Sequence, residues 1–131
     1  MGTTYLLDTN TVIYFLDSLL TEKSLDFIEK CLDNQAVAIS VISKIELLGW
    51  REGSPKQLQN VTDFIQEIEV LALTDAIVGG TIEIRRSQKI KLPDAVIAAT
   101  AIVHDLTLIS RNDDDFRKVP ELKYLNPFTD I

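Results

Sequence analysis

Short apolar runs alternate along the chain with longer segments in which apolar residues recur every three or four positions. The short runs are rich in β-branched and large aliphatic residues, which is typical of strands buried on both faces of a sheet. They lie at residues 5–7, 36–39, 69–73, 106–109 and 123–125, the last as an edge strand. Strands separated in this way by helices predict an α/β sandwich, in which a parallel sheet carries helices on both faces.

Capping residues and proline mark where the predicted helices begin. Thr9 or Asn10 is expected to cap the first helix, and Ser40 or Ser43 a later one. The pair Ser54–Pro55 combines an N-cap with proline at the first helical position. The remaining helices are expected at about 22–32, from 74–75 to about 89, and from Pro93 onward.

Length and composition indicate an ordinary folded protein. With 131 residues, of which 46% are hydrophobic and 25% charged, the chain is expected to form one domain over residues 1–131. No apolar run approaches the roughly 18 residues of a membrane span, and the start lacks the pattern of a signal peptide. A single cysteine, Cys31, excludes an internal disulfide and a thiolate metal cage. The expected location is therefore the reducing cytoplasm.

The net charge of −7 argues against a general nucleic-acid binder, which would be basic overall. Net charge does not show where the charges lie, however. An acidic protein can still cut nucleic acid if its carboxylates hold cations and a local basic patch holds phosphates.

Acidic residues occur where a parallel sheet would place a functional site. Asp8 ends the first predicted strand, and the polar run 112–115 follows the fourth. Ligand sites in such sheets form beyond the carboxyl ends of the strands. Glu46 and Asp94 lie in the first turns of predicted helices that point toward the same edge. These carboxylates are therefore candidates for one cluster.

Such a cluster would have definite chemistry. At about 6 Å and an effective dielectric near 20, each pair of carboxylates repels by about 3 kcal/mol, so the cluster should take up protons or bind a cation. Oxygen ligands without thiolate or imidazole suit Mg²⁺ or Mn²⁺ and do not suit zinc. His104 is the only histidine, which excludes a histidine-based nuclease site.

Basic residues that could bind phosphate form a second group. The cationic residues ahead of the helix that contains Asp94 are Arg85, Arg86, Lys89 and Lys91. Their spacing places several of them on one helical face, which can equally be a plain solvated surface. Arg111, inside the loop after the fourth strand, is the better single candidate for contact with a substrate.

Four segments together carry a resemblance to a known family. They are Leu6–Asn10 (LLDTN), the helical Glu46, Leu92–Ala101 (LPDAVIAATA) and Ser110–Phe116 (SRNDDDF). In this order and at these separations, over nearly the whole chain, they resemble the PIN-domain family. The similarity is greatest to the VapC toxins of toxin–antitoxin pairs.

The resemblance implies a Mg²⁺- or Mn²⁺-dependent endoribonuclease with strand order 3-2-1-4-5. Asp8, Glu46 and Asp94 match the family's first three acidic positions. Many relatives carry the fourth acid where Asn112 stands, so Asp115 is expected to supply it and Asn112 to line the site, with Asp113 as an adjacent candidate.

The resemblance also implies roles and partners. Asp8 and Asp94 would hold the metal, while Glu46 or Asp115 orients a water or supports a second ion. Thr9 and Asn10 would hold a ligand, cap the first helix, or do both. RNA is the implied substrate, and a cognate VapB-like antitoxin the implied partner.

A homodimer is expected on separate grounds. The stretches Val12–Leu20 and Ala76–Ile84 are too apolar to be covered by one small sheet.

Three other functions remain open at this point. Asp8-Thr9-Asn10-Thr11-Val12 is similar to the nucleophile motif of haloacid-dehalogenase-like phosphatases, although Asn10 replaces their second aspartate. A non-toxin PIN nuclease or a catalytically weak RNA-binding PIN domain is another possibility. A DNA-cutting relative is the third, because no feature of the sequence reads the 2′-hydroxyl of RNA.

Overall fold

The computed structural model describes residues 2–131, in which five short strands form one parallel sheet. The strands are β1 (Tyr5–Leu7), β2 (Val37–Ser40), β3 (Glu69–Leu71), β4 (Thr107–Ile109) and β5 (Lys123–Leu125). Their spatial order is β3-β2-β1-β4-β5, and every neighbouring pair is parallel. The expected fold class and strand order are therefore confirmed. The third strand ends two residues before its predicted boundary, because residues 72 and 73 are exposed.

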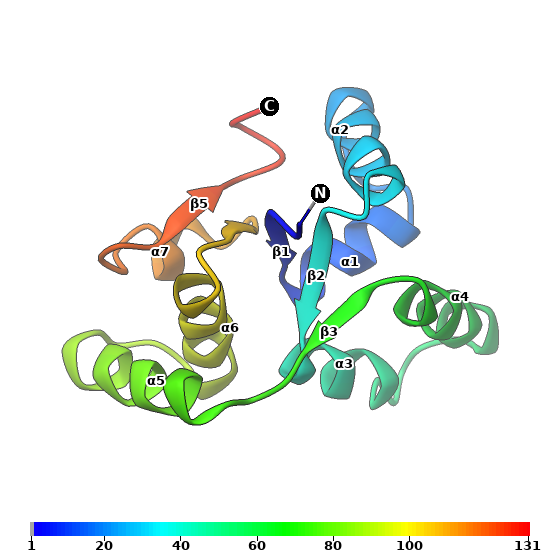
Figure 1. The fold of residues 1–131 in the computed structure, drawn as a ribbon. Coiled ribbons are helices and arrows are strands. Elements are labelled where there is room, and N and C mark those ends of the chain that lie inside the picture. Colours follow the sequence, from blue (N-terminus) through cyan, green and yellow to red (C-terminus); the bar gives the residue numbers. More distant parts are fainter. Residues whose placement is uncertain (1) are drawn as a thin grey trace.

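Helices connect successive strands and cover both faces of the sheet (Figure 1). They are α1 (Thr9–Leu16), α2 (Glu22–Asp33), α3 (Val41–Leu48), α4 (Pro55–Gln66), α5 (Asp75–Ser87), α6 (Leu92–Val103) and the short α7 (Asp113–Phe116). Helices α5 and α6 lie on one side of the sheet, and α1 to α4 on the other. Within the described residues, no helix is both long and apolar enough to cross a lipid bilayer.

Successive side chains of the central strands point to opposite faces of the sheet, which divides the core into two clusters. Leu6 of β1 is in register with Ala38 and Leu108, and all three pack toward α5 and α6. The next residues along these strands are Leu7, Ile39 and Ile109, which pack toward the other layer of helices. Both faces of the strands are thus buried, which explains why the strand sequences are apolar throughout.

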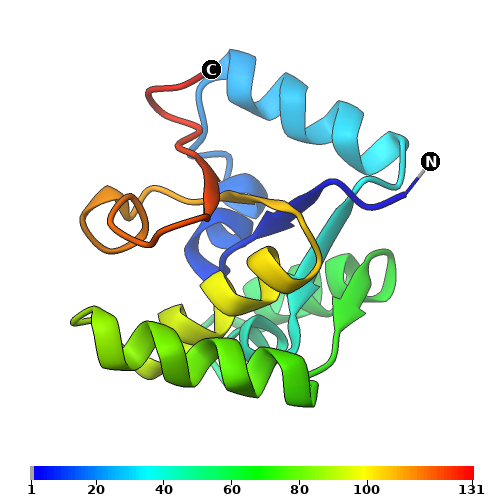
Figure 2. The same ribbon diagram turned by 60° about the vertical axis from the view of Figure 1, so that its left-hand side comes forward.

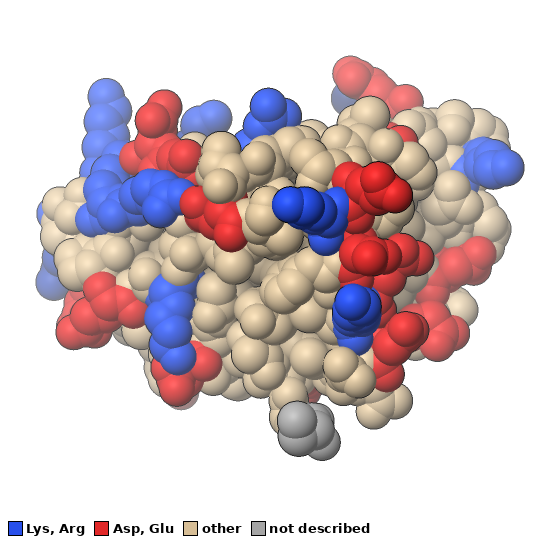
Figure 3. All heavy atoms as spheres, turned by 90° about the horizontal axis from the view of Figure 1, so that it is seen from above, with Lys and Arg blue, Asp and Glu red and all other residues tan. Residues whose placement is uncertain are grey.

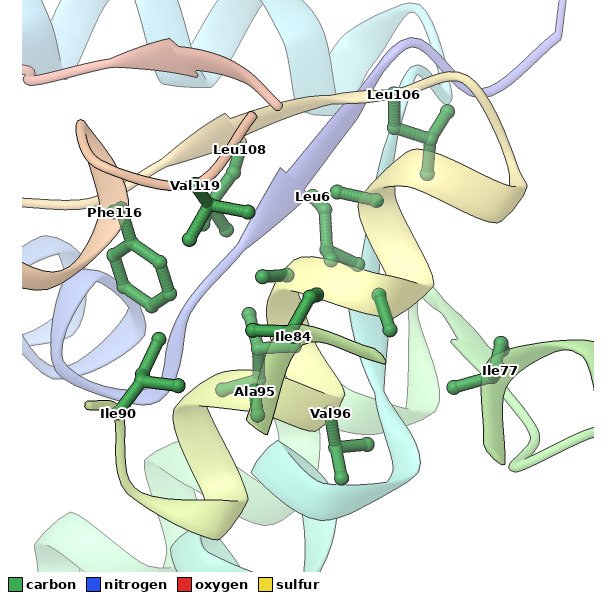
Figure 4. Packing of buried hydrophobic residues seen from close by; sticks show 14 of the residues in the cluster. Leu6, Ile77, Ile84, Ile90, Ala95, Val96, Leu106, Leu108, Phe116 and Val119 are labelled. Atoms are coloured by element: carbon green, nitrogen blue, oxygen red, sulfur yellow. The ribbon is translucent and has the colours of Figure 1, made fainter. Parts of the chain in front are cut away.

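Helix α6 lies at the centre of its layer. Every residue from Ala95 to Ala101 is buried, and α5 lies along the outer side of α6 (Figure 2). A Cβ on Gly80 would come within 3.3 Å of the Ala99 Cβ, so small residues allow the two helices to approach closely. Figure 4 shows Ile84 of α5 and Ala95 of α6 in the cluster that also contains Leu6 of the sheet.

The structure corrects the predicted cap of the first helix. Asp8, rather than Thr9 or Asn10, is the N-cap of α1, since its side chain accepts a hydrogen bond from the backbone N–H of Thr11. The strand therefore passes directly into the helix, and Thr9 is already helical. Ser54 forms the predicted cap of α4 and completes a capping box with Gln57.

Candidate active site

Asp8 lies at the carboxyl end of β1 with only 7% of its surface exposed. Its Oδ1 accepts a hydrogen bond from the backbone N–H of Thr11 at 2.9 Å, and its Oδ2 accepts one from the Ser110 hydroxyl at 2.6 Å. Burial raises the pKa of Asp8, and these hydrogen bonds oppose the rise because they favour the charged form. Protein donors therefore hold this carboxylate in one orientation.

Glu46 approaches the same region from α3. Its exposed carboxylate accepts a hydrogen bond from the Thr9 hydroxyl, with 2.6 Å between Oε1 and Oγ1. The buried Ser43 hydroxyl lies 3.0 Å from the same Thr9 oxygen. Thr9 thus connects the start of α1 to Glu46, which gives it a positioning contact in addition to its place in the helix.

The loop after β4 contributes the fourth acidic residue. Asn112 accepts a hydrogen bond from the backbone N–H of Asp115 at 3.4 Å, and its side-chain N–H donates to Asp115 Oδ2 at 3.0 Å. The next residue, Phe116, is buried in the core beside Ile90 (Figure 4). A cap on one side and an aromatic anchor on the other therefore fix Asp115 in this loop.

Ser110 joins this loop to Asp8, and the sequence analysis did not assign it a role. Its fully buried hydroxyl donates to Asp8 and accepts a hydrogen bond from the backbone N–H of Asn112 at 3.0 Å. The sequence feature that could have indicated this role is the position of the serine, directly after the strand β4 that pairs with β1. Its importance becomes evident once β1 and β4 are known to be neighbours.

Asp94 is the third residue of α6 and is half-buried. Burial raises its pKa to about 6, assisted by the charges of Asp115, Asp8 and Glu46 and by a hydrogen bond with Asp115. The structure therefore brings Asp94 within electrostatic reach of the other three predicted acids, at the carboxyl ends of β1 and β4. A half-buried carboxylate with three other acids nearby forms a site for a proton or a cation.

The chemistry of this donor set fits Mg²⁺ or Mn²⁺. Every donor is a carboxylate, amide or hydroxyl oxygen. Burial and the nearby charges of Asp115, Asp8 and Glu46 raise the pKa of Asp94, and a cation would offset those charges. Within residues 2–131, no three His, Cys, Asp or Glu side chains are close enough to hold one ion as they stand. Asp8, Glu46 and Asp115 accept hydrogen bonds from protein donors, which orient their carboxylates and leave further lone pairs for an ion.

Asp113 lies outside this cluster. Its carboxylate accepts hydrogen bonds from the Tyr124 hydroxyl at 2.6 Å and from the Asn126 amide at 3.1 Å, and Arg117 lies 3.4 Å away. The hydrogen bonds, of which that from Tyr124 is the strongest influence, lower the pKa of Asp113. Asp113 therefore attaches α7 to β5, while Asp115 faces the other acids.

Basic residues line a cavity of about 500 Å³ that shares Asp115 with the cluster. The lining residues are Arg85, Lys89, Ile90, Lys91, Asp115 and Lys118. Lys118 lies 3.6 Å from Asp115 and donates to the Lys89 carbonyl, a role that the sequence analysis missed. Arg85 donates to the Ile90 carbonyl at 2.8 Å. Arg86 is exposed and does not line this cavity.

Arg111 and Asn10 lie in a different cavity, of about 310 Å³, on the side of Asp8. Arg111 is exposed, and its guanidinium lies over the ring of Phe128. The two groups of basic residues predicted to contact substrate therefore lie beside two different members of the acidic cluster.

The charges on the molecule are unevenly distributed. On the face shown in Figure 3, acidic side chains predominate toward the side of α2, whereas most of the Lys and Arg side chains lie toward the opposite side. An excess of negative charge over the whole chain is thus compatible with local basic surfaces.

A parallel sheet of this order, with acidic residues gathered where β1 and β4 end, defines a PIN-type α/β nuclease fold. The PIN-domain model matches residues 5–122, and the chain belongs to this family. PIN domains are nucleases, which assigns the chain to the hydrolases that act on nucleic acid and removes the phosphatase alternative.

Solved structures of toxin–antitoxin complexes contain similar chains. A chain of a toxin–antitoxin complex from Klebsiella pneumoniae is 29% identical, with a TM-score of 0.73 and coverage of 95% of this chain and 98% of that one. A chain of DNA-bound VapBC from Salmonella typhimurium is 26% identical, with a TM-score of 0.79 and coverage of 95% of this chain and 98% of that one. A chain of VapBC2 from Rickettsia felis, bound to a promoter DNA fragment, is 23% identical, with a TM-score of 0.80 and coverage of 96% of this chain and 98% of that one. No curated protein sequence matches the chain.

Proposed function

We propose that this protein is a Mg²⁺- or Mn²⁺-dependent endoribonuclease of the VapC kind, restrained in the cytoplasm by a cognate antitoxin. The observation that carries the proposal is the position of Asp94 beside Asp115, Asp8 and Glu46. Burial raises the pKa of Asp94 to about 6, and the charges of these three acids add to the rise. Repulsion of this kind disfavours the unliganded protein, and a divalent cation relieves it.

Each residue contributes a definite function to phosphodiester hydrolysis. Asp8 and Asp94 would hold the cation. Thr9 orients Glu46 and Asn112 orients Asp115, and these two carboxylates would accept hydrogen bonds from the attacking water. A bound divalent ion supplies Lewis acidity, which activates water and offsets the negative charge of the phosphate. By family resemblance, the products carry a 5′-phosphate and a 3′-hydroxyl.

The basic cavity beside Asp115 supports a polyanionic substrate. Arg85, Lys89, Lys91 and Lys118 line a space that shares Asp115 with the acidic cluster, so these cations could hold phosphates next to the cleaved bond. The choice of RNA over DNA comes from the family resemblance.

A protein partner is proposed from the assemblies that similar chains form and from the charge of the site. The Klebsiella, Salmonella and Rickettsia chains come from toxin–antitoxin or VapBC complexes. An arginine from a partner could enter the acidic cluster, form bidentate hydrogen bonds and displace the cation. Expression of the chain alone should therefore arrest growth, and co-expression with a neighbouring antitoxin gene should restore it.

The direct test compares cleavage of RNA and DNA of one sequence, with Mg²⁺ and with EDTA. Wild type should cut only RNA and only with metal, Asp94→Asn should be inactive, and Asp114→Asn should remain active. Asp114 is a matched control because it is exposed and lies beside the site without joining the cluster. Cleavage of DNA alone, or metal-independent cleavage, would contradict the proposal.

A further inference from the structure

The cavity on the Asp8 side differs in character from the basic cavity beside Asp115. It is lined by Asp8, Asn10, Tyr14, Arg111 and Asn112. It thus combines one aromatic residue, two amides and one guanidinium with a carboxylate of the acidic cluster. Its volume of about 310 Å³ lies at the lower end of the range of small-molecule pockets.

Phe128 fixes the orientation of Arg111. The guanidinium carbon lies 4.2 Å from the centroid of the Phe128 ring, and Tyr14 contacts the same ring edge-on at 5.5 Å. A guanidinium at this distance above an aromatic face is held by a cation–π interaction. Since Arg111 is exposed, the face of the guanidinium that is turned away from Phe128 is accessible.

Hydrogen bonds to buried side chains in turn hold Phe128 in place. Its backbone N–H donates to the Asn126 side chain at 2.8 Å, and Asn126 is buried. The preceding residue, Pro127, accepts a hydrogen bond from the fully buried hydroxyl of Ser24 on α2. The stack of Arg111 on Phe128 is therefore built from three separate parts of the chain and is organised before any ligand arrives.

Two further observations favour a planar ligand over a simple anion. Arg111 forms no ion pair within the part of the chain that the structure describes, and the Asn10 side chain makes no hydrogen bond there. An anion could be bound by a flexible lysine, whereas a guanidinium held flat presents a surface on which a nucleobase can stack. An exposed amide nearby can bond to the edge of that base.

We propose that this cavity binds one nucleobase of the RNA strand, stacked on Arg111 and contacted by Asn10, next to the phosphodiester bond that is cut. The inference rests on the proposed function and adds a base-reading position to it. A base inside a duplex is already stacked and paired, so the site requires single-stranded RNA.

The test measures binding, so it does not depend on cleavage. Fluorescence anisotropy in EDTA compares a short single-stranded oligoribonucleotide with the same strand carrying one abasic residue at each position in turn. At one position, removal of the base should weaken binding about tenfold, and at the other positions it should have a smaller effect. This difference between positions should disappear in Arg111→Lys, which keeps the charge, and in Phe128→Leu. Arg51→Lys, at an exposed arginine outside the site, should preserve it.

Three outcomes overturn the inference. Equal effects of abasic residues at every position, or wild-type discrimination by folded Arg111→Lys, would mean that Arg111 contacts only phosphate. If the wild type still cuts RNA in Mg²⁺ in either case, the proposed ribonuclease function stands and only the base-reading site is lost. If the wild type neither binds nor cuts any RNA, both proposals fail.

Discussion

The Ser110 hydroxyl donates a 2.6 Å hydrogen bond to Oδ2 of Asp8, between residues 102 positions apart in the chain. The same hydroxyl accepts a hydrogen bond from the backbone N–H of Asn112, whose side-chain amide donates a hydrogen bond to Asp115. One buried side chain thus connects the acid that ends β1 with the acid on α7. The separation between these two carboxylates depends on this connection.

Replacing Ser110 with alanine should therefore disturb both acids. The free energy of unfolding should fall by about 1–3 kcal/mol, because a buried carboxylate oxygen of Asp8 and the partly buried N–H of Asn112 lose their partner. Cleavage should fall by about 10- to 100-fold, as is usual when a residue that orients metal ligands is lost. Urea unfolding and initial cleavage rates measure the two effects. The control is Ser87→Ala at the exposed end of α5, and equal activity of the two variants would remove Ser110 from the site.

Replacing Asp94 or Asp8 with asparagine keeps the size of each side chain and removes its charge. Activity should fall by at least about a hundredfold in each case, because the metal loses a ligand. The metal-free Asp94→Asn protein should melt at a higher temperature than wild type, since repulsion from Asp115, Asp8 and Glu46 is relieved. Cleavage assays and circular dichroism melting provide the measurements. Undiminished metal-dependent cleavage by either variant would exclude that residue from the catalytic site.

Millimolar Mg²⁺ or Mn²⁺ should raise the melting temperature of the wild type by several degrees. A ligand that binds only the folded state stabilises it by mass action. The shift should shrink strongly in Asp94→Asn and should persist in Asp114→Asn, whose substituted residue is exposed beside the site. Differential scanning fluorimetry against metal concentration gives the answer. An unchanged melting temperature in the wild type would count against a metal site.

The stability of the metal-free protein should depend on pH through Asp94. Its pKa is about 6 in the folded protein, against 3.8 for an unperturbed aspartate, so the folded state binds more protons between these values. The free energy of unfolding should therefore rise as the pH falls from about 7 toward 4, because Asp94 carries its full destabilising charge only well above its folded pKa of about 6. After allowance for solvent screening at a half-buried group, the contribution is about 1–2 kcal/mol.

Urea unfolding in EDTA across this pH range measures the effect as a difference between wild type and Asp94→Asn. The comparison is needed because carboxylates with lowered pKa values, such as Asp113 and Asp130, destabilise the protein as they become protonated at low pH. Parallel pH profiles for the two proteins would show that Asp94 ionises normally.

A homodimer remains a prediction, and the structure identifies apolar surface that would support it. In the stretch Ala76–Ile84, Ile77 and Ile84 pack into the core, whereas Val78 and Ile82 are 40% and 47% exposed on the outer helix α5. Light scattering at micromolar concentration should give twice the mass of one chain, and Ile82→Glu should reduce it to that of one chain. A wild-type monomer would show that this surface serves another purpose.

The secondary structure and three candidate acids, Asp8, Glu46 and Asp94, followed from the sequence. Apolar runs and caps such as Ser54–Pro55 act through neighbours in the chain, so local pattern was sufficient to locate them. The strand order came from the resemblance of separate motifs to a known family, because the hydrophobic pattern alone does not say which strands pair. The cap of α1 was predicted wrongly, since Asp8 was considered only as a site residue.

Only the tertiary structure distinguished the roles of the loop aspartates and revealed Ser110. Asp113 and Asp115 are two residues apart in one short acidic run, and nothing local separates them. Their partners come from elsewhere: Tyr124 and Asn126 at β5 hold Asp113, while Asp115 acts on Asp94 of α6. Burial, hydrogen bonding and charge repulsion decide the function of a carboxylate. These depend on side chains that come together only when distant segments pack.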